Sequence, residues 1–309
     1  MNYEEILISI AEKNKNVIIM TAENRAAIRN LPSRLQNQFV DVGISEQSMI
    51  GMATGLALRG RIPVVHALST FLTMRAFEFI RTDVGIGNLP VKIVGAVAGF
   101  LSEANGPTHQ AIEDVSLMRG IPPMQVFAPA DEEDLVIMLP EIISSPSPSY
   151  IRYTNLKAPA AHNKDFKIGR AEVIAEGEDI TILTYGTLFK EALAAAENLS
   201  SKDKSVGIIN LRSLKPIDHE LIENICSKSN LIVTLEDHFI AGGLYSILSE
   251  LLVLKRISAR VLPIALNNKW FKPALLQDVL EYEGFTGKAV ADKIIKHEQE
   301  KHIATEYFY

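Results

Sequence analysis

The sequence of 309 residues contains one cysteine, Cys226, and no block of basic residues. A single thiol excludes an internal disulfide and a cysteine-based metal cluster. With a net charge of -6 and scattered lysines and arginines, nucleic acid is not the expected main partner, because neutralising phosphates requires clustered positive charge.

Long apolar runs and an export signal are also missing. No apolar segment approaches the roughly 20 residues that a membrane-spanning helix needs. The opening MNYEEILISIAEKNKN carries acids where a signal peptide would carry bases. We therefore expect no membrane association and a cytoplasmic location. Walker A and GxGxxG patterns are absent too, so no phosphate-binding loop of these kinds is expected.

What is present is an alternation of short apolar runs with helix-length segments. Hydrophobic residues make up 47% of the chain and charged residues 22%, as in globular proteins. The alternation is typical of parallel sheets with helices on both faces, and the length predicts two domains. Residues 156–178 are polar and interrupted by proline and glycine. We therefore predict an α/β domain over residues 1–160, a linker over 161–178 and a smaller α/β domain over 179–309.

The segment 105–124, NGPTHQAIEDVSLMRGIPPM, places His109 after a Gly-Pro-Thr turn and before an amphipathic run. This pattern predicts a helix that begins close to His109, where unpaired N–H groups and a partial positive charge attract anions. A solvated histidine in a first helical turn is the more common outcome for a single histidine.

Glu46 follows one apolar run and opens a helix predicted over 47–58, with Ser45 as the expected N-cap. In a parallel sheet this position lies at the carboxyl edge, where ligands bind. A carboxylate there would be partly desolvated and suited to proton exchange; the alternative is a capping acid. Phe71 and Phe77 flank the start of another predicted helix, which continues through residue 81. They could stack on a heteroaromatic ring or pack in the core.

Charged groups elsewhere leave two interpretations open. Arg75 and Arg81 could meet an anionic substrate or pair with nearby acids. The consecutive residues Glu236, Asp237 and His238 resemble metal ligands, but consecutive residues of a strand face different directions. A surface or interface role is therefore favoured for them.

Taken in order, these motifs resemble the pyrimidine-binding half of transketolases: GISEQ at 43–47, GLA at 55–57, STFL at 69–72, GPTHQ at 106–110 and LMRGIP at 117–122. In the second half, LRSLKPID at 211–218 and EDHFIAGGL at 236–244 agree with the same family. The resemblance covers nearly the whole chain and indicates the C-terminal subunit of a split, two-chain transketolase.

The resemblance implies thiamine diphosphate as the cofactor. Glu46 would hydrogen-bond N1′ of the aminopyrimidine and promote the imino tautomer that deprotonates C2 of the thiazolium. Phe71 would stack on the pyrimidine, with Phe77 nearby, and Glu23 would contact the cofactor across an interface. His109 would bind the carbonyl or hydroxyls of the donor. This scheme is chemically coherent, because the cofactor acts as the electron sink.

The family's Gly-Asp-Gly motif and Mg2+ ligands belong to a diphosphate-binding domain that the sequence does not contain. The resemblance therefore implies an N-terminal partner subunit that holds Mg2+, in an α2β2 heterotetramer, and no metal ligand in this chain. The complex would transfer a two-carbon ketol unit from a ketose donor to an aldehyde acceptor. Alternatives are the β subunit of a 2-oxo acid dehydrogenase, a deoxyxylulose-phosphate-synthase-like ligase using pyruvate, and a degenerate regulatory subunit. GPTHQ and RGIP favour transketolase.

Three positions depart from the family pattern. Asn105 replaces the aspartate that reads a sugar hydroxyl, Val97 replaces a phosphate-binding histidine, and Asn155 replaces an arginine that clamps phosphate. Asn105 is neutral and both donates and accepts hydrogen bonds. We therefore expect a substrate other than a simple sugar phosphate, or a phosphate held by other groups such as Arg75 or the partner chain.

Overall fold

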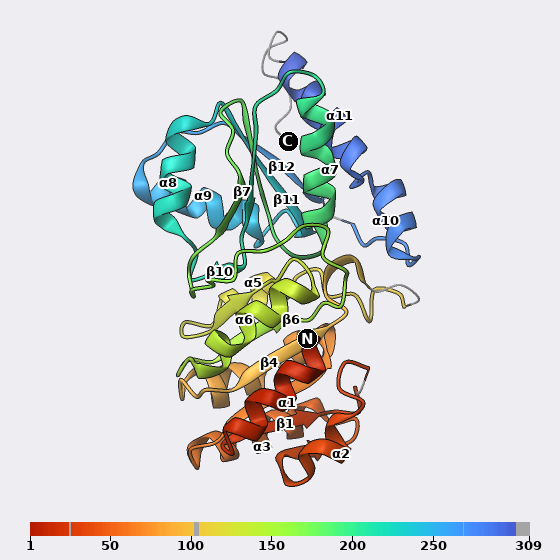
Figure 1. The fold of residues 1–309 in the computed structure, drawn as a ribbon, viewed down its shortest axis with the longest axis vertical. Helices are drawn as coiled ribbons and strands as arrows, with labels where there is room; N and C mark the ends of the chain where they lie inside the picture. Colours follow the sequence, from red (N-terminus) through yellow and green to blue (C-terminus); the bar gives the residue numbers. More distant parts are fainter. Residues whose placement is uncertain (25, 102–104, 268, 301–309) are drawn as a thin grey trace.

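The computed structural model describes residues 1–24, 26–101, 105–267 and 269–300 (Figure 1). They form a seven-stranded sheet, ordered β10-β5-β6-β4-β3-β1-β2, and a five-stranded sheet, ordered β12-β11-β8-β9-β7. The predicted α/β architecture is confirmed. Within the described part of the chain, every helix is too short or too polar to cross a bilayer.

Six strands of the first sheet are parallel and come from the first half of the chain. They are β1 (Val17–Thr21), β2 (Phe39–Asp41), β3 (Ile62–Leu68), β4 (Lys92–Ala96), β5 (Gln125–Phe127) and β6 (Ser149–Arg152). The central strands β1, β3 and β4 are buried along nearly their whole length, which fits a parallel sheet covered on both faces.

Helices cover both faces of this sheet. One core cluster joins the sheet to α1 (Tyr3–Lys13), α2 (Leu31–Leu35) and α6 (Glu132–Ser144). On the opposite face, a second cluster contains side chains of α3 (Glu46–Leu58) and α5 (Asp114–Arg119). This second cluster continues into α8 (His219–Lys228) and α9 (Leu244–Lys255), so the two halves of the chain share one core.

The second sheet is built from β7 (Glu172–Ala175), β8 (Ile180–Thr184), β9 (Val206–Asn210), β11 (Leu231–Phe239) and β12 (Val261–Leu266). A third core cluster packs α7 (Phe189–Ser200), α10 (Leu276–Glu283) and α11 (Gly287–Gln299) against it. In Figure 1 these three helices lie on the face opposite α8 and α9.

Two short strands were not predicted from the sequence, and one of them joins the two halves of the chain. Residues 161–178, predicted as a linker, contain β7, which pairs antiparallel with β9 at the sheet edge. Further on, β10 (Ser213–Lys215) pairs antiparallel with β5 and so extends the first sheet. Both strands have four residues or fewer, too short for a hydrophobic period to be visible in the sequence.

Three predicted helix starts and spans need correction. Ser45 makes no side-chain cap of α3, because its hydroxyl donates to the Val42 carbonyl at 3.1 Å. The helix expected through residue 81 is two π-helical segments, η2 (Phe71–Arg75) and η3 (Ile80–Gly85), around α4 (Phe77–Phe79). The helix expected at His109 begins only at Asp114, because residues 106–109 form a turn closed by the His109 N–H on the Gly106 carbonyl.

Candidate active site

The predicted site residues follow neighbouring strands of the first sheet. Strands β4, β3, β1 and β2 are consecutive in the sheet, and the chain passes from β2 across β1 to β3. Glu23 follows β1, Glu46 follows β2, Phe71 follows β3 and His109 follows β4. All four therefore lie beyond carboxyl ends of parallel strands, where the order of the strands reverses and ligands of such sheets bind.

Three of these side chains, Glu46, Phe71 and His109, form a continuous row together with Arg75. Glu46 is 2% exposed, and its Oε2 accepts a hydrogen bond from Nη1 of Arg75 at 3.1 Å. The Arg75 guanidinium carbon lies 4.0 Å from the centroid of the Phe71 ring. The Phe71 ring in turn meets the His109 imidazole edge-on, with 5.2 Å between centroids. We call Glu46, Arg75, Phe71 and His109 the edge row.

A π-helical turn explains how Phe71 and Arg75 meet. In η2, the N–H of Ala76 donates to the Phe71 carbonyl at 3.0 Å, a bond over five residues. Such wider turns are rare in proteins, and those that occur often lie at functional sites. A repeat of 3.6 residues cannot reveal them in a sequence, so this part of the geometry was not predicted.

His109 is half-buried in the turn after Gly106. The hydroxyl of Thr108 lies 2.9 Å from its Nδ1, which leaves Nε2 for another partner. The next residue, Gln110, is fully buried and its side-chain amide donates to the Phe271 carbonyl at 3.0 Å. Because Phe271 belongs to the second half of the chain, this bond ties the histidine turn to both domains.

The other predicted residues lie around the edge row. Glu23 is exposed with a φ of 64°, and Asn105 and Asn155 are exposed. Phe77 is half-buried and packs against the core cluster shared by the two domains. Residues 102–104, next to Asn105, lie outside the described residues. The roles assigned to these four side chains stay predictions.

Val97 has an unusual backbone conformation directly after β4. Its φ is 61°, in the left-handed region where a β-branched side chain is a genuine outlier. Such a conformation costs on the order of 1–3 kcal/mol and is concentrated at functional sites. Val97 is also the position at which the family pattern has a histidine. The departure from the family pattern and the strained backbone therefore occur at the same residue.

Arg152 lies in a buried polar cluster between the two domains, which the sequence did not predict. It donates to Asp114 Oδ2 at 2.8 Å and Oδ1 at 2.6 Å, and to Asp237 Oδ1 at 2.5 Å. Both carboxylates are 0% exposed. Burial acts to raise the pKa of Asp114, but the Arg152 charge and hydrogen bonds outweigh it and hold that pKa below its usual value.

The segment 236–238 therefore has an interface role between the domains, and the predicted surface alternative is wrong. All three side chains are 0% exposed. Glu236 accepts from the N–H groups of Leu244 and Tyr245 at the start of α9, and burial raises its pKa to about 7. Burial lowers the pKa of His238 to about 4, and its Nε2 accepts from the Ser116 N–H.

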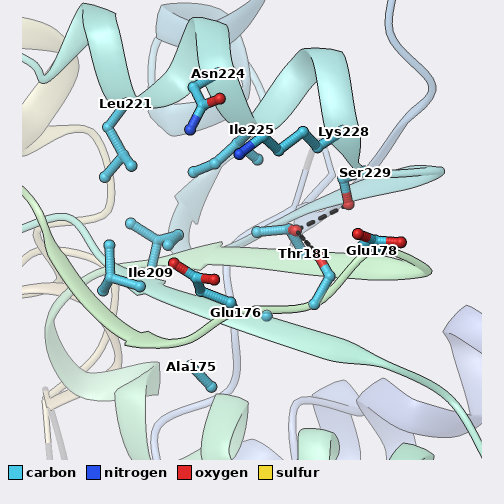
Figure 2. A pocket seen from close by; sticks show the side chains of 13 residues that line it. Ala175, Glu176, Glu178, Thr181, Ile209, Leu221, Asn224, Ile225, Lys228 and Ser229 are labelled. Atoms are coloured by element: carbon cyan, nitrogen blue, oxygen red, sulfur yellow. Dashed lines mark hydrogen bonds between the residues drawn. The ribbon is translucent and has the colours of Figure 1, made fainter.

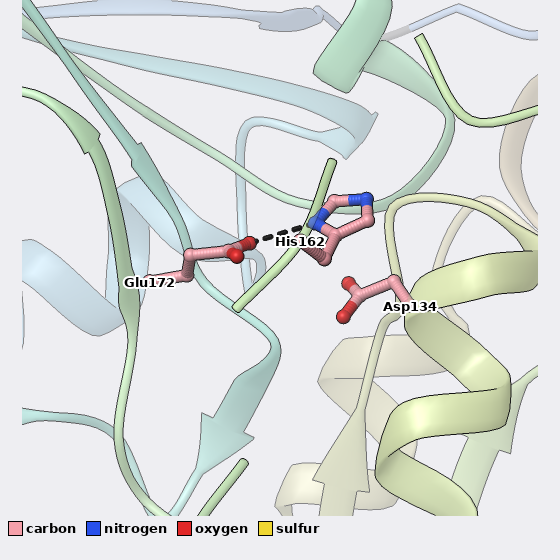
Figure 3. A group of neighbouring side chains, drawn as sticks. All are labelled: Asp134, His162 and Glu172. Atoms are coloured by element: carbon pink, nitrogen blue, oxygen red, sulfur yellow. Dashed lines mark hydrogen bonds and ion pairs between the residues drawn. The ribbon is translucent and has the colours of Figure 1, made fainter. Parts of the chain in front are cut away.

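A second interdomain cluster surrounds His162 (Figure 3). Asp134, His162 and Glu172 offer ligand atoms within 4.8 Å of one another, as in a cation site. However, His162 Nε2 lies 2.7 Å from Asp131 and Nδ1 lies 2.8 Å from Glu172, so both ring nitrogens face carboxylates. Arg212 also pairs with Asp134 and Glu172, each at 2.7 Å. Side chains thus supply the positive charge that a metal would bring.

We predict that His162 stabilises the fold as an imidazolium. Burial acts to lower its pKa, but hydrogen bonds to Asp131 and Glu172 and the charge of Asp134 raise it from 6.5 to about 10. Because the folded pKa is raised, this stability is complete below pH 6.5 and is lost as the pH rises through about 10. Nitrogen NMR at pH 8 should show two ring protons in the folded chain.

Melting curves provide the control for this prediction. The difference in melting temperature between wild type and H162N should be largest at or below pH 6.5 and should shrink as the pH rises through about 10. H219N, which changes the exposed histidine at the start of α8, should leave the pH dependence unaltered. A single ring proton on His162 at pH 8 would contradict the assignment.

A separate hollow of about 140 Å³ lies between β7, β9 and α8 in the second domain (Figure 2). Its lining includes Glu176, Glu178 and Lys228 above apolar residues of β9 and α8. The Thr181 hydroxyl at its wall is already bonded to Ser229 at 2.8 Å. None of the lining residues belongs to the edge row, so the row at the carboxyl edge remains the candidate active site.

The edge row suits one half of a thiamine-type cofactor. A nearly buried carboxylate and the half-buried ring of Phe71 are suited to an aminopyrimidine, which needs a hydrogen-bonding acid and an aromatic stacking surface. A diphosphate would need backbone N–H groups or cations together with a divalent metal. The edge row supplies a single cation, Arg75, and that cation is paired with Glu46.

The first domain is thus a parallel α/β domain with its candidate site at the carboxyl edge of the sheet, the edge at which sheets of this class bind ligands. Residues 1–159 match the family described as transketolase, pyrimidine binding domain, and residues 169–290 match transketolase, C-terminal domain. The chain belongs to the transketolase family, which confirms the resemblance inferred from the sequence motifs.

Relatives agree on the family and differ in activity. The chain is 36% identical over 256 residues to a 6-deoxy-6-sulfo-D-fructose transketolase subunit, SqwH, of Clostridium sp. (strain MSTE9), covering 81% of this chain and 79% of that one. It is 36% identical over 299 residues to a 1-deoxy-D-xylulose-5-phosphate synthase of Dictyoglomus thermophilum, spanning 95% of this chain but only 48% of the relative. A solved split gene transketolase, described as an inactive beta4 tetramer, has a TM-score of 0.87 at 32% identity, covering 95% of this chain and 96% of that chain.

Proposed function

We propose that the chain is the C-terminal subunit of a thiamine-diphosphate-dependent transketolase that transfers a two-carbon ketol unit from a ketose donor to an aldehyde acceptor. The observation that carries the proposal is the edge row, where a nearly buried Glu46, Phe71 and His109 lie together at one sheet edge. The cofactor would supply the carbanion-stabilising chemistry when bound.

In this proposal, Glu46, Phe71 and His109 of the edge row each have a task that follows from their position. Glu46 would hold a proton at N1′ of the aminopyrimidine, because its carboxylate is shielded from water. Phe71 would orient the ring by stacking. The Thr108 hydroxyl lies beside Nδ1 of His109, so Nε2 would be the nitrogen that hydrogen-bonds the carbonyl or hydroxyl of the donor.

What the first domain provides supports the proposal of a partner subunit. The edge row fits the aminopyrimidine, whereas the diphosphate and Mg2+ would be held by an N-terminal subunit in an α2β2 heterotetramer. The names of two relatives support this, since one is a transketolase subunit and the other a putative transketolase C-terminal section from Methanocaldococcus jannaschii, 32% identical over 95% of this chain and 94% of that one. Reconstitution of turnover and cofactor binding with the product of a neighbouring reading frame tests the proposal.

The substrate proposed is not a simple sugar phosphate. Val97 and Asn155 stand where the family pattern has phosphate ligands, and a relative acts on a ketose with a sulfonate at C6, as its name states. A sulfonate carries one charge and a phosphate nearly two, so fewer cationic ligands suffice. A 6-sulfonated ketose is therefore the first donor to test.

We predict that V97H shifts the complex towards phosphorylated sugars. Histidine tolerates the left-handed φ of 61° better than valine does, and it adds a donor at the carboxyl end of β4. Transfer from xylulose 5-phosphate to ribose 5-phosphate should be poor in wild type and improve roughly tenfold in V97H, the value of one added charge-assisted hydrogen bond. V97N, which relieves the strain without adding a cation, is the matched control.

Wild-type transfer between these phosphates at ordinary transketolase efficiency would overturn the substrate proposal while leaving the ketol-transfer proposal intact. Equal gains in V97H and V97N would attribute the effect to backbone strain alone.

A second candidate is a deoxyxylulose-phosphate-synthase-like ligase that uses pyruvate as donor. Identity of 36% over 299 residues to one such synthase favours it, although the chain spans about half of that protein. Release of carbon dioxide from labelled pyruvate by the reconstituted complex would support the ligase, whereas ketose consumption without it would support transketolase.

A further inference from the structure

Arg75 makes two contacts that the proposed function assigns to the aminopyrimidine ring. Its Nη1 donates to Oε2 of Glu46 at 3.1 Å, and its planar guanidinium lies over the Phe71 ring at 4.0 Å. We propose that Arg75 is an internal placeholder, which occupies the aminopyrimidine position in the cofactor-free chain and leaves both contacts when the cofactor binds. The inference rests on the proposed function and deepens it.

The chemistry of the guanidinium suits this position. It is planar and delocalised, stacks on aromatic faces and donates to carboxylates, as a protonated aminopyrimidine would. It also neutralises Glu46, whose side chain is only 3% exposed, and a buried carboxylate without a partner is costly. The placeholder therefore keeps the proton-handling acid compensated before the cofactor arrives.

Arg75 has room to move outward even though it makes these two contacts. Its side chain is 43% exposed, and it sits at the last residue of the π-helical turn η2. The Phe71 ring also keeps its T-shaped contact with His109, which does not involve Arg75. Swinging the long arginine side chain into solvent would thus uncover one ring face and the carboxylate together, with no required change in the backbone.

Competition between Arg75 and the cofactor has a measurable consequence. A cofactor that binds only the open arrangement has its apparent affinity reduced by the fraction of chains that are open. A half-exposed ion pair and one cation–π contact are individually weak, so the expected reduction is roughly 3- to 10-fold.

The test measures the affinity of the complex with the N-terminal subunit for thiamine diphosphate. The cofactor is titrated into the complex in a calorimeter, with Mg2+ at saturation. R75M should bind the cofactor roughly 3- to 10-fold more tightly than wild type, and R75K, which keeps the charge, should lie between them. R81M is the matched control, since Arg81 lines a different hollow with Ile121 and Pro122. The R81M complex should bind thiamine diphosphate as tightly as wild type.

A second readout uses the cofactor-free chain alone. R75M should melt below wild type because Glu46 loses its partner, whereas the cofactor-loaded complexes should melt at similar temperatures. The placeholder proposal would be overturned if R75M bound thiamine diphosphate no more tightly than wild type. An unchanged cofactor affinity with a raised KM for the donor would instead identify Arg75 as a substrate ligand. Failure of the wild-type complex to bind thiamine diphosphate would overturn the proposed function and the placeholder together.

Discussion

Replacing Glu46 with alanine should abolish nearly all turnover of the reconstituted complex, with a loss of about 10²- to 10⁴-fold in kcat. Glu46 is 2% exposed at the start of α3 and is the acid of the edge row. It contacts Arg75, which in turn lies over the Phe71 ring. Steady-state ketol transfer with saturating thiamine diphosphate and Mg2+ measures the effect.

Two further variants separate chemistry from folding in this experiment. E46Q keeps the size and hydrogen-bonding capacity of the side chain but not its charge, so its kcat should fall nearly as far as in E46A. E78A removes an exposed acid of α4 and should keep wild-type turnover. Wild-type rates in E46A, with the heterotetramer intact by sedimentation, would sink the assignment and favour a regulatory subunit.

The sequence predicted the parts of this site that depend on the order of elements along the chain. Glu46, Phe71 and His109 each follow an apolar run, and parallel strands bring their carboxyl ends to one edge, so their proximity follows from topology. The Arg75–Glu46 pair was not predicted, because it depends on a π-helical turn, and the alternatives weighed for Arg75 were a substrate anion or nearby acids of its own helix.

Long-range polar contacts account for most of what the sequence could not supply. Arg152 meets Asp114 and Asp237 across 38 and 85 residues, and no spacing rule links positions so far apart. The sequence offered a surface or an interface position for residues 236–238, and it could not tell that the segment is buried, because the His238 contact with Ser116 of α5 joins positions 122 residues apart. Short edge strands such as β10 were missed for the same reason: their partners are distant in sequence.

Removing the charge of Arg152 should destabilise the chain more than any other single substitution considered above. Arg152 is 4% exposed between two fully buried carboxylates, one from each domain, and its guanidinium also faces the Tyr185 ring at 5.2 Å. Truncating one partner of such a buried group costs about 3–5 kcal/mol, because the remaining charges stay buried without compensation. R152M should therefore lower the melting temperature by on the order of 10 °C.

The matched control is Arg170, which also bridges two carboxylates, Asp218 and Glu220, but with a side chain that is 58% exposed. R170M should melt close to wild type, since exposed ion pairs are screened by water. The triple variant R152M/D114N/D237N should recover part of the loss, because no uncompensated charge remains in the interface. If R152M and R170M melted alike, the interdomain cluster would contribute no more than a surface pair, and docking of the two domains would rest on the shared apolar core around α8 and α9.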